Sequence, residues 1–574
     1  MLSASEVEAF ITRLEGRVAA VEKTVREAWW RLATTGTEEA QADLVAAGKE
    51  YNRLFAAKDE YAKVRGYYEE RESLENGLLR RQVEVVYRIF ASRHGDRETL
   101  DLIEELEARA NAIYGNYRGV VAGKEVGENE IREILRFSDD ESLRREAWEA
   151  SKTVGRAVED TVRELARLRN QLAREAGYPD HFHLALDLQE IDAGELDGIM
   201  AELESATEAP FTEFKERLYE KLKVRFGVET VMPWHLSDPF FQSCKHDPIP
   251  LPRQASRGSE GGAFGTGNGG LMSDAERDAL LASVVDVDRF FQDKNLEELT
   301  RKTYDNLGLE VRDVLARSDL YERDGKNQHG FCLSVGREYP YDVRVLVNVR
   351  PDSYWMDTML HEFGHAVYDK HINPKLPYFL RTVAHTCTTE AMALMMGSLT
   401  DDPAWLSAVV GVPEAEFDEV RESLLWSERA DKLVFIRWAL VMFNFEREFY
   451  ANPERVDLNS VWWGLVERLQ LVNRPPGRDE PDWAAKIHVA VAPVYYHNYV
   501  LGQLIAAQLR HQLEERVTGG ESFFMSEVAG RYLQEALFGP GARNRWEDTV
   551  LGATGERLNP GYFVKSLRQS GSSQ

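Results

Sequence analysis

Hydrophobic residues in the first half of the chain recur at intervals of three and four, which is the period of an α-helix with one buried face. Ser5 and Glu8 have the spacing of a capping box at the start of the first such run. The sequence therefore predicts that the chain opens with one long amphipathic helix. Its apolar positions are Val7, Phe10, Ile11, Leu14, Val18, Val21 and Val25.

A second run has the same period and a clear stop. Gly177 can adopt the left-handed conformation that often ends a helix, and Pro179 lacks the N–H that a continuing helix needs. We expect several helices of this kind to pack against one another. The apolar positions of this run are Val158, Val162, Leu165, Leu168 and Leu172.

Convincing alternation with period two, which is typical of a strand, occurs in the stretch "YDVRVLVNV". Val343, Val345, Val347 and Val349 share one face, and "GREYP" before them is expected to form the turn of a hairpin. We predict an edge strand over residues 343–349. The expected fold class is therefore mainly α, with one small sheet.

Residues 252–271 are polar and rich in glycine, with seven glycines from Gly258 to Gly270. The segment contains "GTGNGG", which satisfies the GxGxxG pattern of dinucleotide sites. Such a site needs a preceding apolar strand, and this stretch has none. We interpret the segment as a flexible surface loop.

Composition limits the possible functions. The 574 residues are 43% hydrophobic, which is enough for a large core in one big enzyme domain or in several smaller ones. The formal net charge of −27 argues against nucleic acid or an anionic membrane as a partner, because both would repel the protein. Cys244, Cys332 and Cys387 are too few and too scattered for a disulfide framework, and we expect reduced thiols.

The N-terminal sequence interleaves charges at helical spacing, whereas a signal peptide would have a continuous apolar core. No stretch approaches the roughly 18 uncharged apolar residues of a membrane span. These features predict a cytoplasmic protein without a membrane segment.

Candidate chemistry lies in "DTMLHEFGHAVYDK", residues 357–370. His361 and His365 are four apart and lie on one face of a helix, so both imidazoles can reach one metal ion. Glu362 projects beside them, where a carboxylate can take a proton from water. The opposite face carries the apolar residues Leu360, Phe363 and Val367.

A catalytic zinc of this kind needs a third protein ligand. Glu390 lies 25 residues beyond His365, which leaves room for a loop and a return helix. A glutamate is found near almost any spacing, so two ordinary surface histidines on a helix stay an open alternative from these residues alone. Nitrogen and carboxylate ligands in this pattern favour zinc.

The segment "NRPPGRDEPDWAAKIHVAVAPVYYHNY" resembles, in order and nearly in spacing, a segment of the angiotensin-converting-enzyme family of helical zinc peptidases. Weaker similarities occur at "EAWWRLATTGT", "REAWEASKTVG" and "ATGERLNPGYF". The thimet oligopeptidase and oligoendopeptidase family is a close neighbour. The similarity extends over nearly the whole chain.

The resemblance implies roles for eight residues. It implies that zinc is held by three side chains and that Glu362 acts as general base and then as general acid. It also implies two hydrogen-bond donors to the oxyanion, and a lysine and a tyrosine that bind the C-terminal carboxylate of a substrate. The zinc ligands are His361, His365 and Glu390, the oxyanion donors are His488 and Tyr499, and the carboxylate-binding residues are Lys486 and Tyr496.

The sequence departs from the family in several places. His365 to Glu390 and His488 to Tyr499 are each one residue longer than in the converting enzyme, so the tyrosine roles can shift among Tyr495, Tyr496 and Tyr499. Leu394 stands where the family has an aspartate that orients a metal histidine, and Asp357 and Asp369 are candidates for that role. Leu333 replaces a histidine that contacts substrate. The arginine that serves chloride activation in the family is not found next to the predicted catalytic tyrosine, so chloride dependence is not assumed.

The resemblance implies one catalytic domain over residues 1–574, a two-lobed zincin-like helical fold with the sheet beside the histidine helix and a deep central channel. We expect a zinc peptidase of short oligopeptides that releases C-terminal dipeptides, with the substrate pairing along residues 343–349. An oligoendopeptidase is the alternative, and an inactive metal-binding scaffold is a remote one. The sequence leaves the oligomeric state open.

Overall fold

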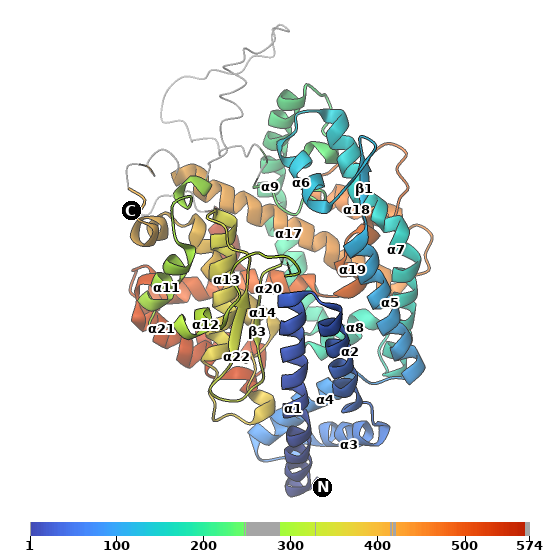
Figure 1. Ribbon diagram of the computed structural model, residues 1–574, viewed down its shortest axis with the longest axis vertical. Coiled ribbons are helices and arrows are strands. Elements are labelled where there is room, and N and C mark those ends of the chain that lie inside the picture. Colours follow the sequence, from blue (N-terminus) through green and yellow to red (C-terminus); the bar gives the residue numbers. More distant parts are fainter. Residues whose placement is uncertain are drawn as a thin grey trace.

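The computed structural model describes residues 2–245, 247, 287–327, 329–413, 416 and 421–568. Helices dominate this part of the chain, where the strands form two antiparallel two-stranded sheets (Figure 1). The prediction of a mainly α fold is confirmed. The glycine-rich loop predicted at 252–271 lies outside the described residues, and the prediction of a single catalytic domain stays a prediction.

The first helix, α1 (Ala4–Thr35), matches the predicted helix except at its start. Ser3 is the N-cap and accepts a hydrogen bond from the Glu6 N–H, so the predicted capping box at Ser5 and Glu8 is wrong by two residues. Serine is a favourable cap at either position, and the structure starts the helix at the earlier one. Helix α1 packs along α2 (Glu38–Arg53) and, with α3 (Lys58–Glu69) and α4 (Gly77–Ala91), encloses a hydrophobic cluster of its own.

The predicted second helix is the middle of α7 (Glu141–Glu175), which ends just before Gly177, whose φ is +92°. A large hydrophobic core runs from the helices around α7 to those near the C-terminus. Its other long elements are α9 (Ala193–Phe226) and α17 (Arg421–Ala451). Figure 1 also labels α5 (Arg97–Asn116), α6 (Glu128–Phe137), α8 (His181–Leu188), α11 (Leu296–Asn306), α12 (Arg312–Arg317), α18 (Leu458–Gln470), α19 (His488–Val491), α21 (Glu527–Leu533) and α22 (Trp546–Thr554), besides the three helices described below.

A small hairpin of β1 (Gly119–Val121) and β2 (Lys124–Val126) packs on α7. The predicted hairpin forms from β3 (Phe331–Ser334) and β4 (Val343–Leu346), with Cys332 opposite Val345. The prediction that residues 343–349 form the free edge is wrong. Asp319 covers the far side of β4, since its N–H donates to the Val345 carbonyl and its carbonyl accepts from Val347. The open edge is therefore β3.

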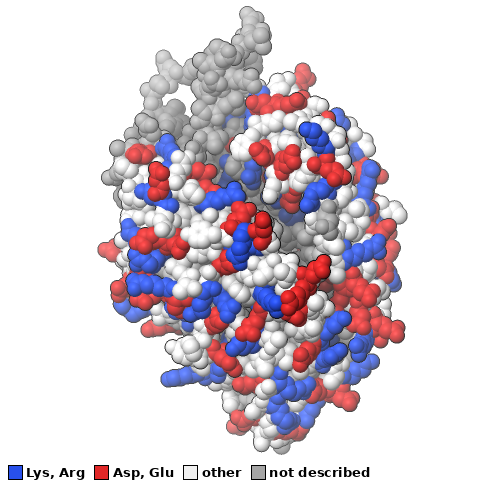
Figure 2. All heavy atoms as spheres, in the orientation of Figure 1, with Lys and Arg blue, Asp and Glu red and all other residues white. Residues whose placement is uncertain are grey.

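Three helices in the middle of the fold carry the predicted chemistry. Helix α14 (Thr386–Gly397) lies between α13 (Ser353–Lys370) and α20 (Tyr496–His511), with β3 and β4 against α13. Acidic and basic side chains are interspersed over the face of the molecule seen in Figure 2, so the net negative charge is not gathered into one patch there. Among the described residues, no helix combines the length and the apolar character that a bilayer span requires.

Candidate metal centre

Helix α13 presents His361 and His365 on one side and buries the other. Asp352 caps its start by accepting a hydrogen bond from the Trp355 N–H. Leu360, Phe363 and Val367 are fully buried, as their spacing predicts. This burial fixes the rotation of the helix, and the two imidazole rings stand 5.0 Å apart, one turn from each other.

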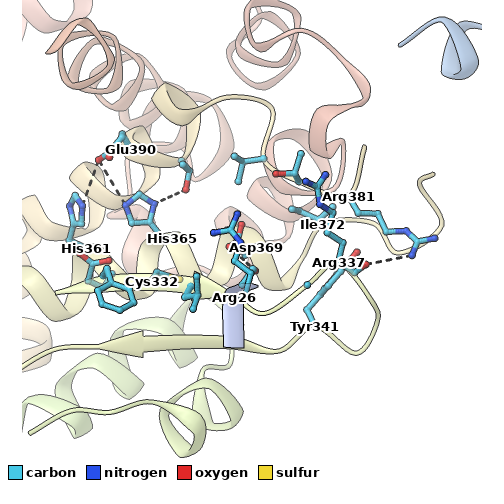
Figure 3. Close-up of a pocket in the computed structure, with 18 of the residues that line it drawn as sticks. Arg26, Cys332, Arg337, Tyr341, His361, His365, Asp369, Ile372, Arg381 and Glu390 are labelled. Atoms are coloured by element: carbon cyan, nitrogen blue, oxygen red, sulfur yellow. Dashed lines mark hydrogen bonds and ion pairs between the residues drawn. The ribbon is translucent and has the colours of Figure 1, made fainter. Parts of the chain in front are cut away.

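Glu390 on α14 reaches both histidines. Its Oε2 atom lies 3.7 Å from His361 Nε2 and 3.9 Å from His365 Nε2 (Figure 3). One ligand atom from each of the three residues lies within 4.8 Å of the others. The same Oε2 atom is buried without a hydrogen-bond partner, which is costly unless a cation occupies the space between the three side chains. Two imidazoles and a carboxylate suit zinc in a site with one open position.

Close helix packing brings Glu390 to this place. A Cβ atom on Gly364 of α13 would stand 2.8 Å from the Cα of Ala393 in α14, and one on Gly502 of α20 would stand 3.0 Å from the Cβ of Glu390. Glycine at both crossings lets α14 approach its two neighbours closely. The glutamate side chain can then bridge to the histidines.

The orienting partner of His365 is a residue that the sequence did not predict. Thr389 Oγ1 lies 2.6 Å from His365 Nδ1, so it holds the ring with Nε2 facing Glu390. The two predicted candidates have other contacts. Asp369 accepts a hydrogen bond from Ser334, and Asp357 faces Lys245 at 4.0 Å.

Glu362 sits at the edge of the metal centre with 8% of its surface exposed. Burial raises the pKa of its carboxyl to about 7, although the charge of His361 and a hydrogen bond from the Cys332 backbone N–H act in the opposite direction. That hydrogen bond comes from β3 and joins the glutamate to the open edge of the sheet. The side chain faces a cavity that also holds Tyr499.

Two cavities lie along the same three helices. The first, of about 470 Å³, is lined by β3, the metal centre and Tyr499, and extends past Arg26 to Tyr341 and Arg381 (Figure 3). The second, of about 820 Å³, is lined by Asp357 of α13, Leu394 of α14 and Gln503 of α20. Each of these lies four residues, or about one turn, from a residue of the first cavity on the same helix. The candidate metal centre therefore lies where the two cavities approach each other.

The three tyrosines that the sequence left interchangeable occupy different places. Tyr499 lines the first cavity. Tyr495 donates a long hydrogen bond of 3.5 Å from its hydroxyl to Glu390 Oε1. Tyr496 is buried, with its ring 5.9 Å from that of Trp438 and 5.0 Å from that of His488.

Lys486 and His488 form a second group next to Tyr496. Lys486 Nζ donates to Gln242 Oε1 at 2.8 Å and lies over the rings of Phe240, Trp438 and Tyr496. Burial lowers the pKa of Lys486 to about 8, and burial together with the lysine charge lowers the pKa of His488 to about 4. Of the eight predicted site residues, five line the first cavity, and Lys486, His488 and Tyr496 do not.

Two residues of the site, Thr389 and Gln242, were missed by reasoning from the sequence, and the contact of a third was not predicted. Thr389 had a local signal, since it directly precedes the predicted third ligand. Gln242, which is 244 residues from its partner Lys486, had none. Tyr495 was considered as an alternative to Tyr499, but its contact with Glu390 depends on how α20 meets α14.

Comparison with known families places these features in context. The family model described as "Angiotensin-converting enzyme" matches residues 2–227 and 333–560, which is most of the chain and includes every predicted site residue. No curated protein matches the sequence.

Proposed function

The chain belongs to the angiotensin-converting enzyme family of peptidases, and we propose that it is a zinc-dependent peptidase that shortens oligopeptides by releasing dipeptides from the C-terminus. The observation that carries the proposal is the convergence of His361, His365 and Glu390, with the Oε2 atom of Glu390 left unpartnered between the two imidazoles. The family match supports the metallopeptidase activity, and the release of dipeptides is our more specific proposal.

His361 Nε2, His365 Nε2 and Glu390 Oε2 are the proposed metal-binding atoms. Zinc bound there supplies a Lewis acid that polarises a carbonyl oxygen and lowers the pKa of water. Thr389 holds the His365 ring, and the buried stripe of α13 keeps both imidazoles at a fixed separation. A set of ligands held in advance in this way costs little reorganisation when the metal binds.

Glu362 is the proposed general base and general acid. Its carboxylate takes the proton that water loses on attack and then gives it to the leaving amine. Tyr499 is the proposed donor to the oxyanion that develops on the scissile carbonyl, because its ring lines the cavity that holds Glu362. His488 is proposed as a second donor, and its lowered pKa keeps the imidazole neutral near pH 7.

The peptide substrate is proposed to extend along β3, the free edge of the hairpin. Residues 330–334 line the first cavity beside the metal centre, so the backbone groups of β3 face the space that a bound peptide would fill. The residues after the scissile bond are proposed to run toward Lys486, with its ammonium binding the terminal carboxylate and Tyr496 beside it. Gln242 accepts a hydrogen bond from Lys486 and is proposed to belong to the same carboxylate-binding group.

Glu362→Gln tests the hydrolytic role. The amide fills the same volume and leaves the three metal-binding side chains intact, so we expect unchanged zinc content and loss of peptide hydrolysis by about 100-fold or more. Metal analysis of the purified wild type and variant provides the control. Hydrolysis that persists in the variant with zinc bound would exclude Glu362 as the base.

A pair of matched peptides tests the dipeptide release. One peptide has a free C-terminal carboxylate and the other is amidated, and mass spectrometry identifies the products. We expect the wild type to release dipeptides from the free acid. Lys486→Met should raise the KM for the free acid by about 10- to 100-fold and leave the KM for the amidated peptide nearly unchanged. Equal cleavage of both peptides by the wild type would favour an oligoendopeptidase instead. A protein that binds zinc but cleaves neither peptide would support the inactive scaffold.

A further inference from the structure

Val494 has an unusual backbone conformation at the entrance to α20. Its φ is +54°, and among the five non-glycine residues with positive φ in the described chain it is the one with a β-branched side chain. A left-handed conformation is unfavourable for such a residue, because its branched side chain crowds the neighbouring carbonyl. A conformation of this kind persists only where the surrounding structure enforces it.

Two side chains from other helices bind the backbone of Val494. Glu446 of α17 accepts a hydrogen bond from the Val494 N–H at 2.8 Å through Oε1. Gln189, which follows α8, donates from Nε2 to the Val494 carbonyl at 3.2 Å. Val494 and Glu446 are nearly fully buried, so water does not compete for these hydrogen bonds.

Gln189 also holds the first turn of α20. Its Oε1 accepts a hydrogen bond from Asn498 Nδ2 at 2.8 Å and lies 3.1 Å from His497 Nε2. The amide is held in turn, because Nε2 also donates to the Ala185 carbonyl. One glutamine side chain therefore connects α8 to both ends of the segment 494–498.

This segment determines where two tyrosines lie. Tyr495 follows Val494 directly and places its hydroxyl at Glu390, and Tyr499 lies about one turn further along and lines the first cavity. Because side chains four residues apart share one face of a helix, a rotation of the first turn moves both rings. Asn498 and His497, between them, point to Gln189 on the other side.

We propose that Gln189 and Glu446 are positioning residues of the active site, which hold Val494 in its left-handed turn and thereby direct Tyr495 to Glu390 and Tyr499 into the cavity. The inference rests on the proposed function, since it concerns how the oxyanion donor and the third metal ligand are supported. Neither Gln189 nor Glu446 touches the reacting atoms.

The support of Gln189 is itself rigid. The next residue, Glu190, also has a positive φ of +59°, and its carboxylate is buried. Arg81 of α4 binds both of its oxygens, at 2.5 and 2.7 Å, and Arg88 lies 3.0 Å from one of them. A buried bidentate pair of this kind fixes the backbone that carries Gln189.

The test compares Gln189→Leu, Val494→Gly and the double variant, each with its metal content measured. We expect Gln189→Leu to lower kcat at least 10-fold with KM changed by less than about threefold, a smaller loss than the roughly 100- to 1,000-fold expected for Tyr499→Phe. Glycine adopts a positive φ without strain. The double variant should therefore have a kcat within about threefold of Val494→Gly alone.

Hydrogen exchange in the metal-free protein gives a readout that does not depend on activity. Gln189→Leu should speed exchange of the Val494 and Asn498 amides at least 10-fold. The control is Gln171→Leu, which removes a side-chain amide bonded to Glu175 on the surface of α7 and should change neither the exchange rates nor kcat. Glu446→Gln keeps an oxygen acceptor for the Val494 N–H, so its kcat should stay close to that of the wild type. Glu446→Leu has no acceptor there, so its kcat should fall.

Different results would refute the two proposals. Wild-type kcat and exchange in Gln189→Leu, with a large loss in Tyr499→Phe, would overturn the positioning role and leave the proposed function intact. Losses in Gln189→Leu that simply add to those of Val494→Gly would also overturn it, because they would mean independent packing effects. Unchanged hydrolysis in Glu362→Gln would instead overturn the proposed function.

Discussion

Replacing Gly364 with alanine tests whether the close contact of α13 and α14 holds the metal centre together. The added Cβ would stand 2.8 Å from the Cα of Ala393, 3.2 Å from its nitrogen and 3.3 Å from the Met392 carbonyl oxygen. Carbon atoms in contact prefer roughly 3.5 to 4.0 Å, so the helices must separate by about 1 Å at this point. All three atoms belong to the backbone and cannot move aside as a flexible side chain would.

The separation has two consequences. Overpacking of this kind lowers the free energy of unfolding by about 1 to 3 kcal/mol. Glu390 lies one turn before Ala393 on α14 and moves with it, whereas metal-ligand distances tolerate only about 0.2 Å. We therefore expect Gly364→Ala to weaken zinc binding by about 10- to 100-fold, the range seen when residues that support a metal ligand are lost.

Chelator competition measures the zinc affinity, and urea unfolding of the metal-free protein measures the stability. Gly198→Ala is the matched control, because Gly198 is an exposed position inside α9 and its added Cβ has no atom within 4 Å. There the same substitution should raise the free energy of unfolding by about 1 kcal/mol through helix propensity and leave zinc binding unchanged. Gly364→Ala with wild-type stability and zinc affinity would refute the reasoning.

Three further predictions concern the support of the site and the fold. Thr389→Val should weaken zinc binding about 10-fold by releasing His365, and Thr389→Ser should not, as measured by chelator competition. Dialysis against a chelator should lower the unfolding temperature and added zinc should restore it, because only the native state presents the three ligands together; an unchanged unfolding temperature would argue against a site of useful affinity. Glu190→Gln should lower the free energy of unfolding by about 1 to 3 kcal/mol near pH 7, because the buried Arg81 loses its bidentate carboxylate partner and keeps only Glu84 as an ion-pair partner. Burial favours the neutral form of Glu190, but the hydrogen bonds and charge of Arg81 and the charge of Arg88 leave the pKa of Glu190 below its ordinary value. The stabilisation by ionised Glu190 is therefore present above the pKa of the unfolded state and is lost as the pH falls through the lower pKa of the folded state. Urea unfolding of both proteins at several pH values should therefore show the difference shrinking in acid.

Some features followed from the sequence because their causes are local. The period of three and four predicted α1, α7 and the buried face of α13, since one turn of helix brings those residues together whatever surrounds them. The sequence did not identify the cap of α1 correctly, because Ser3 and Ser5 both offer a side-chain oxygen within one turn. The valine alternation predicted the strand of the hairpin, but not which strand has the free edge, because Asp319 pairs with β4 from a separate part of the chain.

The sequence by itself determined a mainly helical protein with two histidines on one helix face and a glutamate beside them, because helical geometry acts within a few residues. It also indicated the family, through the order and spacing of several segments. Only the tertiary structure decided that Thr389 supports His365, that Gln242 meets Lys486 and that Gln189 holds the turn at Val494. These contacts arise where helices from distant parts of the chain pack together. Their partners depend on the fit of many side chains at once, which no short stretch of sequence records.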